Sequence, residues 1–198
     1  QKMLLPLCCV LLFWHPLACY AAVKNPVRTT DSVLLVPSGV AYAILPADRA
    51  AGGGVTHGAE SKGSSLTSVI LDPDPSSSPS SVIFHPLNAN ATDVRVSTDL
   101  NIEFADDSIT VTVWKVSPYD KATKQYFITT GGRLGDKSAS NVNSWFRIEE
   151  NGFFYNIRFC PSVCKTCKVL CKYVGVYNDG GVKRLALSDV PFRFMFSF

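Results

Sequence analysis

The sequence contains few charged residues and no run of basic ones. Asp, Glu, Lys and Arg make up 18% of its 198 residues, and the formal net charge is +3. Proteins that bind nucleic acid or anionic membranes carry a dense basic patch or a polybasic helix, and this chain shows neither pattern. We therefore expect the mature protein to bind neither nucleic acid nor a membrane.

Catalytic motifs are also missing. The sequence has no GxSxG or HExxH, and its two histidines beyond residue 21, His57 and His85, both lie in loop context. The glycines at 52–54 lack the strand–GxGxxG–helix context of a dinucleotide site. The adjacent acids at 106–107 and 149–150 would point to opposite faces of a strand, which suits solvated turns better than acid–base catalysis. We expect no enzyme activity, no cofactor and no metal.

No segment has the apolar periodicity of a long amphipathic helix. Instead, about a dozen short apolar or β-branched runs are separated by turn signals. They lie at 33–46, 55–57, 68–71, 81–84, 100–104, 109–116, 125–130, 145–149, 153–160, 169–177, 184–188 and 192–198. This pattern predicts an all-β sandwich or a closed barrel without choosing between them.

A faint internal echo suggests repeats. A Trp-led strand precedes an aromatic-rich strand both at 113–132 and at 145–159. Repeats of about fifty to sixty residues would fit three times into the mature chain. The two tryptophans of these segments, Trp114 and Trp145, are expected to pack in a barrel or its cap.

The first 21 residues have the pattern of a secretory signal peptide. An apolar run from Met3 leads to small residues, and cleavage after Ala21 leaves Cys19 and Ala21 at the −3 and −1 positions. A membrane anchor is the alternative, but the run is short for a bilayer and is broken at His15-Pro16. We expect a signal peptide at 1–21, a single domain at 22–198, and a monomer that is secreted or sent to the vacuole.

Four cysteines remain in the mature chain, within twelve residues. They are Cys160, Cys164, Cys167 and Cys171. An even number of cysteines on an oxidising route predicts disulfides, although four thiolates could also hold zinc. The spacing and the lack of a nearby histidine favour bridges.

Five segments of the second half match one protein family. They are STDLNIEF (97–104), TVWKV (112–116), WFRIE (145–149), FCPSVCKTCKVLC (159–171) and GGVKRLALSDVPF (180–192). In these segments the chain resembles the plant Kunitz (soybean trypsin inhibitor) family, most closely its miraculin-like branch. The resemblance implies a β-trefoil, in which twelve strands in three repeats form a six-stranded barrel capped by three hairpins. It also implies the disulfides Cys160–Cys171 and Cys164–Cys167.

The chain departs from the family pattern in its first half. The opening signature of the family, an Asp and then Asp-Gly, is reduced to TTDSVLLVPSG at 29–39. Most members also have a disulfide between the first two repeats, and its cysteines align near Ser64 and Ser108. In the chain-entropy model, a bridge over about 45 residues contributes about 3–4 kcal/mol, so we expect its absence to reduce stability.

The segment between 81–84 and 97–104 aligns with the reactive loop of inhibitory relatives, which docks like a substrate into a serine protease. The resemblance places this loop at Asn88, Ala89, Asn90, Ala91, Thr92 and Asp93, with Asn90 as the primary specificity residue. Trypsin-type pockets hold a buried carboxylate, which an asparagine leaves unpaired. The nearest basic residue, Arg95, lies five positions away, and the loop-bracing asparagine of the family aligns near the shorter Ser38. Trypsin inhibition is expected to be weak or lost.

Asn90 also begins the sequon Asn90-Ala91-Thr92, the single N-x-[ST] site of the sequence. An exposed sequon in a secreted protein is a glycan acceptor, and a glycan at this place would obstruct a protease cleft. An unoccupied sequon is the alternative.

We interpret the sequence as that of a secreted, Kunitz-type serine endopeptidase inhibitor-like protein of plant defence or storage. One alternative is a non-inhibitory β-trefoil that binds a carbohydrate or a protein. Ricin-type trefoils carry Q-x-W in each repeat, whereas the two glutamines here, Gln1 and Gln125, precede no such tryptophan. Another alternative is an inhibitor that uses a different face against cysteine proteases or amylase.

Overall fold

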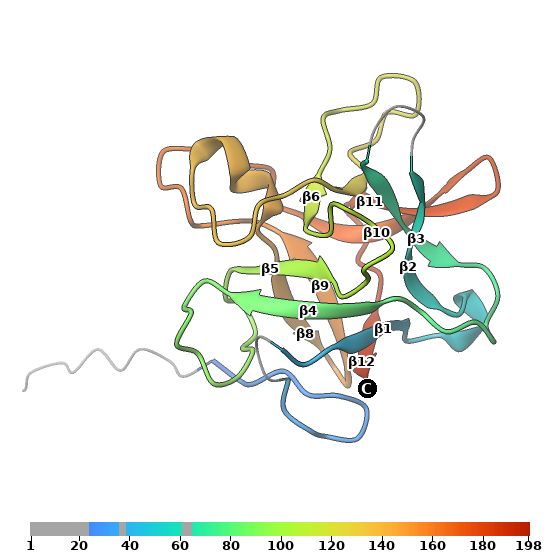
Figure 1. Cartoon of the computed structure of the whole chain (residues 1–198), viewed down its shortest axis with the longest axis horizontal. Helices are drawn as coiled ribbons and strands as arrows, with labels where there is room; N and C mark the ends of the chain where they lie inside the picture. Colours follow the sequence, from blue (N-terminus) through green and yellow to red (C-terminus); the bar gives the residue numbers. More distant parts are fainter. Residues whose placement is uncertain (1–23, 36–38, 61–64) are drawn as a thin grey trace, which may run out of the picture.

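The computed structural model describes residues 24–35, 39–60 and 65–198 (Figure 1). The expected signal peptide at 1–21, with Cys8, Cys9 and Cys19, lies outside these ranges, as do Ser38 and Ser64. No helix within the described ranges is both long and apolar enough to cross a bilayer.

Within the described ranges the chain forms twelve strands and two short 3-10 helices. In order they are β1 (Tyr42–Pro46), η1 (Arg49–Ala51), β2 (Gly54–Glu60), β3 (Thr67–Asp72), β4 (Ser81–Pro86), β5 (Leu100–Phe104), β6 (Trp114–Val116), β7 (Ile128–Thr130), η2 (Ala139–Ser144), β8 (Arg147–Asn151), β9 (Phe154–Phe159), β10 (Lys172–Asp179), β11 (Val182–Ser188) and β12 (Phe194–Ser197). Each predicted run overlaps one of these strands.

Six of the strands close into a barrel. Antiparallel pairs join β1 to β4, β4 to β5, β8 to β9, β9 to β12, and β12 back to β1. The remaining gap, between β5 and β8, is bridged at Leu100 and Phe146, whose backbones exchange hydrogen bonds of 2.9 and 2.8 Å. The ends of the barrel strands, and with them the two ends of each connecting loop, are therefore fixed in space.

The other six strands form three hairpins, β2–β3, β6–β7 and β10–β11, whose labelled strands lie toward the top and the right of Figure 1. The hairpins also contact one another, because β3 pairs with β7 and with β11, and Phe127 is bridged to Ala186. The three repeats begin at Tyr42, Leu100 and Phe154. This is the twelve-stranded, all-β trefoil that the family resemblance implies, and the predicted repeat length is correct.

The internal echo, however, compares strands that are not equivalent. The segment 113–132 forms the hairpin β6–β7, whereas 145–159 forms β8 and β9, two barrel strands from neighbouring repeats. Aromatic residues recur in both segments because the strands of both segments pack against the shared core. The echo therefore reflects the burial of these strands and not equivalent positions in two repeats.

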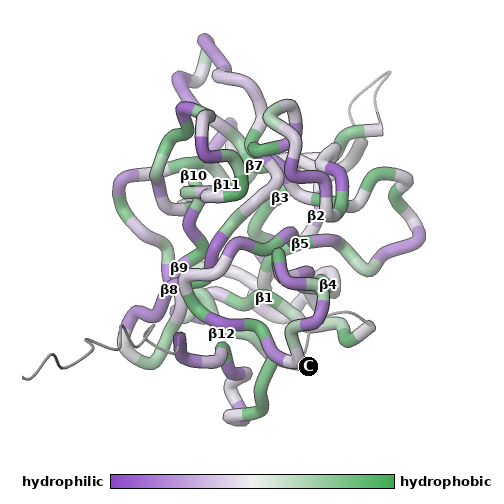
Figure 2. The backbone as a smooth tube through the Cα atoms, turned by 90° about the vertical axis from the view of Figure 1, so that its left-hand side faces the viewer, coloured by the Kyte–Doolittle hydropathy of each residue, from purple (hydrophilic) through white to green (hydrophobic). Residues whose placement is uncertain are grey.

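Aromatic side chains fill the core. The ring of Trp114 lies 5.5 Å from that of Phe104 and 6.4 Å from that of Phe146, measured between centroids. Trp114 and Trp145 are both buried, as predicted. Hydrophobic and hydrophilic stretches alternate along the chain in Figure 2, as expected for strands that face a core on one side.

Candidate functional site

The candidate site is the loop that joins β4 to β5, residues 87–99, seen in green at the left of Figure 1. Pairing of Pro86 with Leu100 brings the two ends of the loop together, and Leu87 N donates to Asp99 O at 2.8 Å. The loop thus leaves and re-enters the barrel at one point, which presents its middle to solvent.

The tip of the loop is exposed and is held by its own turn. Asn88, Ala89, Asn90 and Thr92 are exposed, whereas Ala91 and Asp93 are partly buried. Asn90 N donates to Asn88 Oδ1 at 3.1 Å, and Ala91 N donates to Asn88 O at 3.0 Å. Among the described residues, no hydrogen bond from the body of the protein reaches the backbone of 88–93. The tip therefore presents an uncharged Asn90 without support from below.

The returning arm of the loop is firmly attached. Val94 and Val96 are buried, and Val94 exchanges backbone hydrogen bonds of 2.8 Å with Leu35 and Val27. Val96 N donates to Asn25 O at 3.0 Å. The N-terminal segment thus pairs with this arm and fixes it against the barrel.

Arg95 is folded back onto this arm. Its Nε and Nη2 each donate to a carboxylate oxygen of Asp93 at 2.8 Å, and its Nη1 donates to Lys24 O at 2.9 Å. A bidentate carboxylate pair is a strong and geometrically specific contact. The guanidinium of Arg95 is therefore committed within the chain and does not project from the tip.

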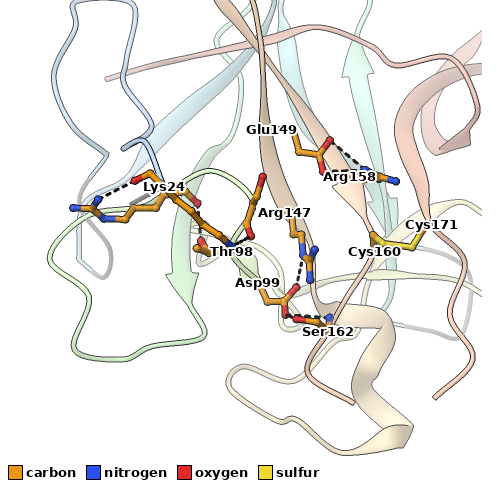
Figure 3. A network of polar contacts seen from close by, with 11 residues as sticks. Lys24, Thr98, Asp99, Arg147, Glu149, Arg158, Cys160, Ser162 and Cys171 are labelled. Carbon is orange, nitrogen blue, oxygen red and sulfur yellow. Dashed lines mark hydrogen bonds and ion pairs between the residues drawn. A yellow bond between two sulfur atoms is a disulfide. The ribbon is translucent and has the colours of Figure 1, made fainter. Parts of the chain in front are cut away.

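The base of the loop is anchored by a buried carboxylate (Figure 3). Asp99 is 4% exposed, and its Oδ1 accepts from Arg147 Nε on β8 at 2.8 Å. Its Oδ2 accepts from Ser162 N at 3.0 Å and from Ser162 Oγ at 2.5 Å. Ser162 lies between Cys160 and Cys164, so the cysteine segment holds the base of the loop. Sequence reasoning missed this contact, because nothing local connects positions 63 residues apart.

The structure joins Cys160 to Cys171 and Cys164 to Cys167, the pairing that the family resemblance implies. In the described part of the chain, no group of three or more histidine, cysteine or acidic side chains is arranged to hold a metal ion. The bridges shape the segment that carries Ser162, so they act on the candidate loop through Asp99.

A cavity of about 650 Å³ separates the tip from the barrel. Its lining includes Asn88, Asn90, Asp93, Arg95, Thr98 and Arg147. The tip thus stands away from the barrel.

The histidines lie on strands, so the predicted loop context was wrong. His57, on β2, is 2.9 Å from Asp106 Oδ2, and His85, on β4, is 2.8 Å from Glu103 Oε2. Glu103 Oε1 also accepts from Thr112 Oγ1 at 2.8 Å. Each histidine has one carboxylate partner, and these contacts tie neighbouring segments together.

Asp106 is expected to make stability sensitive to acid. Hydrogen bonds from Ser108, and then from His57, lower the pKa of Asp106 from 3.8 to about 2. A carboxyl whose folded-state pKa is depressed contributes stability above its unfolded pKa, and this contribution is lost as the pH falls toward about 2. Asp106→Asn should therefore flatten the dependence of unfolding free energy on pH between about 4 and 2. Urea unfolding across this range measures the effect.

The neighbouring exposed Asp107 provides the matched control, because no hydrogen bond holds its carboxylate among the described residues. Asp107→Asn should keep the wild-type slope. Equal slopes for Asp106→Asn and the wild type would contradict the assignment.

Comparison with known proteins gives a consistent picture. A family model described as "Trypsin and protease inhibitor", of the legume Kunitz type, matches residues 34–197. The chain is 42% identical to Kunitz trypsin inhibitor 5 of Arabidopsis thaliana, over 88% of this chain and 86% of that protein. It is 40% identical to miraculin of Synsepalum dulcificum, over 87% and 83% of the two chains.

Among solved structures, the fold is similar to that of the Kunitz-type cysteine protease inhibitor PCPI-3 from potato. The TM-score is 0.75 and the sequence identity 33%, over 88% of this chain and 97% of the potato protein. The trypsin inhibitor from soybean aligns with a TM-score of 0.68 at 19% identity, over 87% and 98% of the two chains, which shows the shared fold.

Proposed function

Because this chain belongs to the Kunitz family of plant trypsin and protease inhibitors, we propose that it inhibits a serine endopeptidase through the β4–β5 loop, with Asn90 as the primary specificity residue. Members of this family act as inhibitors of enzymes and are not enzymes themselves. In this proposal, inhibition of trypsin through the β4–β5 loop is weak or lost.

One observation carries the proposal, namely that the exposed tip of the loop presents no cation. Asn90 is exposed and uncharged, and Arg95 is held by Asp93 and Lys24. A protease whose specificity pocket ends in a carboxylate finds no cation at this tip, and an unpaired buried charge opposes binding. The loop therefore suits a protease that accepts an uncharged polar side chain.

We also propose that the chain follows the secretory route to the extracellular space or the vacuole, in defence or storage, and carries a glycan at Asn90. The two bridges support an oxidising route, since disulfides persist there. Exposure of Asn90 and Thr92 supports access of the glycosylation machinery to the sequon. A glycan at this place would stand between the loop and a protease, so the proposed inhibition through Asn90 applies to molecules in which the sequon is unoccupied.

Titration of the glycan-trimmed protein against trypsin, chymotrypsin and subtilisin tests this function. We expect at least one protease without a carboxylate in its pocket to be inhibited about tenfold more tightly than trypsin, equivalent to about 1.4 kcal/mol. Intact mass before and after deglycosylation reports whether the sequon is occupied. Failure to inhibit any of the three would contradict the proposal and favour a non-inhibitory binding module.

A second candidate target is a cysteine protease. The observation behind it is the similarity to the potato cysteine protease inhibitor, which exceeds the similarity to the soybean trypsin inhibitor in both sequence identity and TM-score. Titration against a papain-type enzyme, with Asn90→Gln as the comparison, would show whether this activity exists and whether it uses the same loop.

A further inference from the structure

A second exposed loop carries the cation that the β4–β5 loop lacks. It joins β7 to β8 and runs through Arg133, Leu134, Gly135, Asp136 and Lys137. The side chain of Arg133 is 79% exposed, and its nearest carboxylate oxygen, on Asp136, is 3.9 Å away. Leu134 beside it is also exposed. The guanidinium is therefore available to a partner.

Buried side chains hold the backbone of this loop from beneath. Asn141 Oδ1 accepts from Arg133 N at 3.0 Å, while Asn141 Nδ2 donates to Arg133 O at 2.8 Å and to Asp136 O at 3.0 Å. Trp145 Nε1 also donates to Asp136 O, at 2.9 Å. Asn101 Oδ1 accepts from Gly135 N at 2.9 Å. All three of these side chains are buried.

The supporting side chains are themselves fixed. Ser144 Oγ donates to Asn141 Oδ1 at 3.0 Å, and Asn101 Nδ2 donates to Ser144 O at 2.8 Å. Gly132 allows the close approach, because a Cβ there would lie 2.5 Å from Ser144 Oγ. A loop that is already ordered loses little conformational entropy when it binds.

The two loops thus differ in the charge that they present and in the hydrogen bonds that hold their backbones. The tip at 88–93 carries no cation and is held by its own turn, whereas the loop at 133–136 carries the exposed cation Arg133 and is held by hydrogen bonds on both sides of Leu134. They lie next to each other, since one cavity of about 290 Å³ is lined by Leu87 and Ala89 from the first and by Leu134 and Lys137 from the second.

The peptide groups of Arg133 are not available to a protease. Its N–H and its carbonyl oxygen are both bonded to Asn141, so the carbonyl points toward the body of the protein. A catalytic serine attacks a carbonyl whose oxygen is bound in the oxyanion hole of the enzyme. The side chain of Arg133 is therefore accessible to a protease, whereas the peptide bond that follows Arg133 is not in position to be attacked.

We propose that the β7–β8 loop is a second protease-binding site, at which Arg133 enters the specificity pocket of a trypsin-type serine endopeptidase without being cleaved. The pairing is that of a guanidinium with the buried carboxylate of the pocket, which suits the planar, always-charged arginine side chain. The inference rests on the proposed inhibitory function for the class of partner, but it uses a different loop. It predicts a weak inhibition of trypsin that depends on Arg133.

Trypsin itself is the probe for this site, with the glycan-trimmed full chain as the inhibitor. We expect inhibition in the micromolar range that free benzamidine competes away, because the amidine occupies the same pocket. Arg133→Ala should weaken this inhibition at least about tenfold, equivalent to about 1.4 kcal/mol. Lys137→Ala, which removes a neighbouring exposed cation, should change it less than about twofold. An unchanged inhibition constant for Arg133→Ala, or no trypsin binding by the wild type, would overturn the proposal.

Cleavage provides an independent measurement. After prolonged incubation with trypsin, the intact mass of the wild type should show no hydrolysis between Arg133 and Leu134. Asn141→Asp keeps the acceptor for Arg133 N and loses the donor to Arg133 O, so this variant should be cut at that bond. Circular dichroism checks that Asn141→Asp is folded. The titration with Arg133→Ala tests the proposal whether or not Asn141→Asp folds. Cleavage of the wild type at this bond would overturn the withheld-carbonyl geometry.

Failure of this inference can be separated from failure of the proposed function. The β4–β5 loop is tested by proteases without a pocket carboxylate and by changes at Asn90. The β7–β8 loop is tested by trypsin and by changes at Arg133. Variants at Asn90 therefore report on the β4–β5 loop, and variants at Arg133 report on the β7–β8 loop.

Discussion

Asn90→Arg is expected to convert the β4–β5 loop into a trypsin-binding loop, with the affinity raised by about 2–5 kcal/mol, or roughly 30- to 4,000-fold. The arginine would pair with the pocket carboxylate that asparagine leaves unpaired. The measurement is the inhibition constant for trypsin in an Arg133→Ala background, so that the β7–β8 loop contributes nothing.

The change also removes the sequon, and this effect needs its own control. Asn90→Gln removes the sequon without adding charge, so it isolates the effect of the glycan from that of the cation. If Asn90→Arg binds trypsin no better than Asn90→Gln, then position 90 does not face the specificity pocket. A tip that binds and is rapidly cut would instead show that the position is right and that the unsupported turn is too loose.

Asp99→Ala is expected to lower the free energy of unfolding by about 3 kcal/mol. The buried carboxylate accepts from Arg147 and twice from Ser162, and its removal leaves these donors without an acceptor. For a domain of this size, such a loss lowers Tm by about 6–12 °C. Urea and thermal unfolding measure it.

Asp189→Ala is the matched control for this prediction. Asp189 pairs with Lys172, but its side chain is 83% exposed, and such exposed pairs contribute about 1 kcal/mol or less. A similar loss from both variants would mean that the contacts of Asp99 carry no special weight. A double-mutant cycle with Ser162→Ala would isolate the link between the loop and the cysteine segment.

The sequence predicted those parts of the molecule that local patterns specify. Short alternating runs bounded by turn residues located the twelve strands, and the x3–x2–x3 cysteine spacing identified the family. The position of the candidate loop followed from the segments on either side of it. Inhibition of a protease by this loop stays a prediction.

Contacts between residues that are far apart in the sequence could not be predicted from it. His57 and Asp106 are 49 positions apart, and Asn101 meets Gly135 across 34. Trp145 was expected in the core and is buried there, yet its indole nitrogen also supports the β7–β8 loop. Gly131 and Gly132 are a turn signal directly after β7, but nothing in the sequence indicates that the following Arg133 has its backbone fixed by Asn141. Such pairings arise from the barrel geometry, which no local pattern encodes.

The pairing of β1 with β12 determines when the molecule can be completed. These strands match from Ala43 with Ser197 to Pro46 with Phe194, so one edge of β1 stays open until the last strand is available. A ribosome delivers β1 early and β12 late, and an open strand edge is a template for pairing with another chain. The newly made protein therefore passes through a period in which its first repeat must be kept away from copies of itself. That period ends when residues 194–197 leave the ribosome and the barrel shuts.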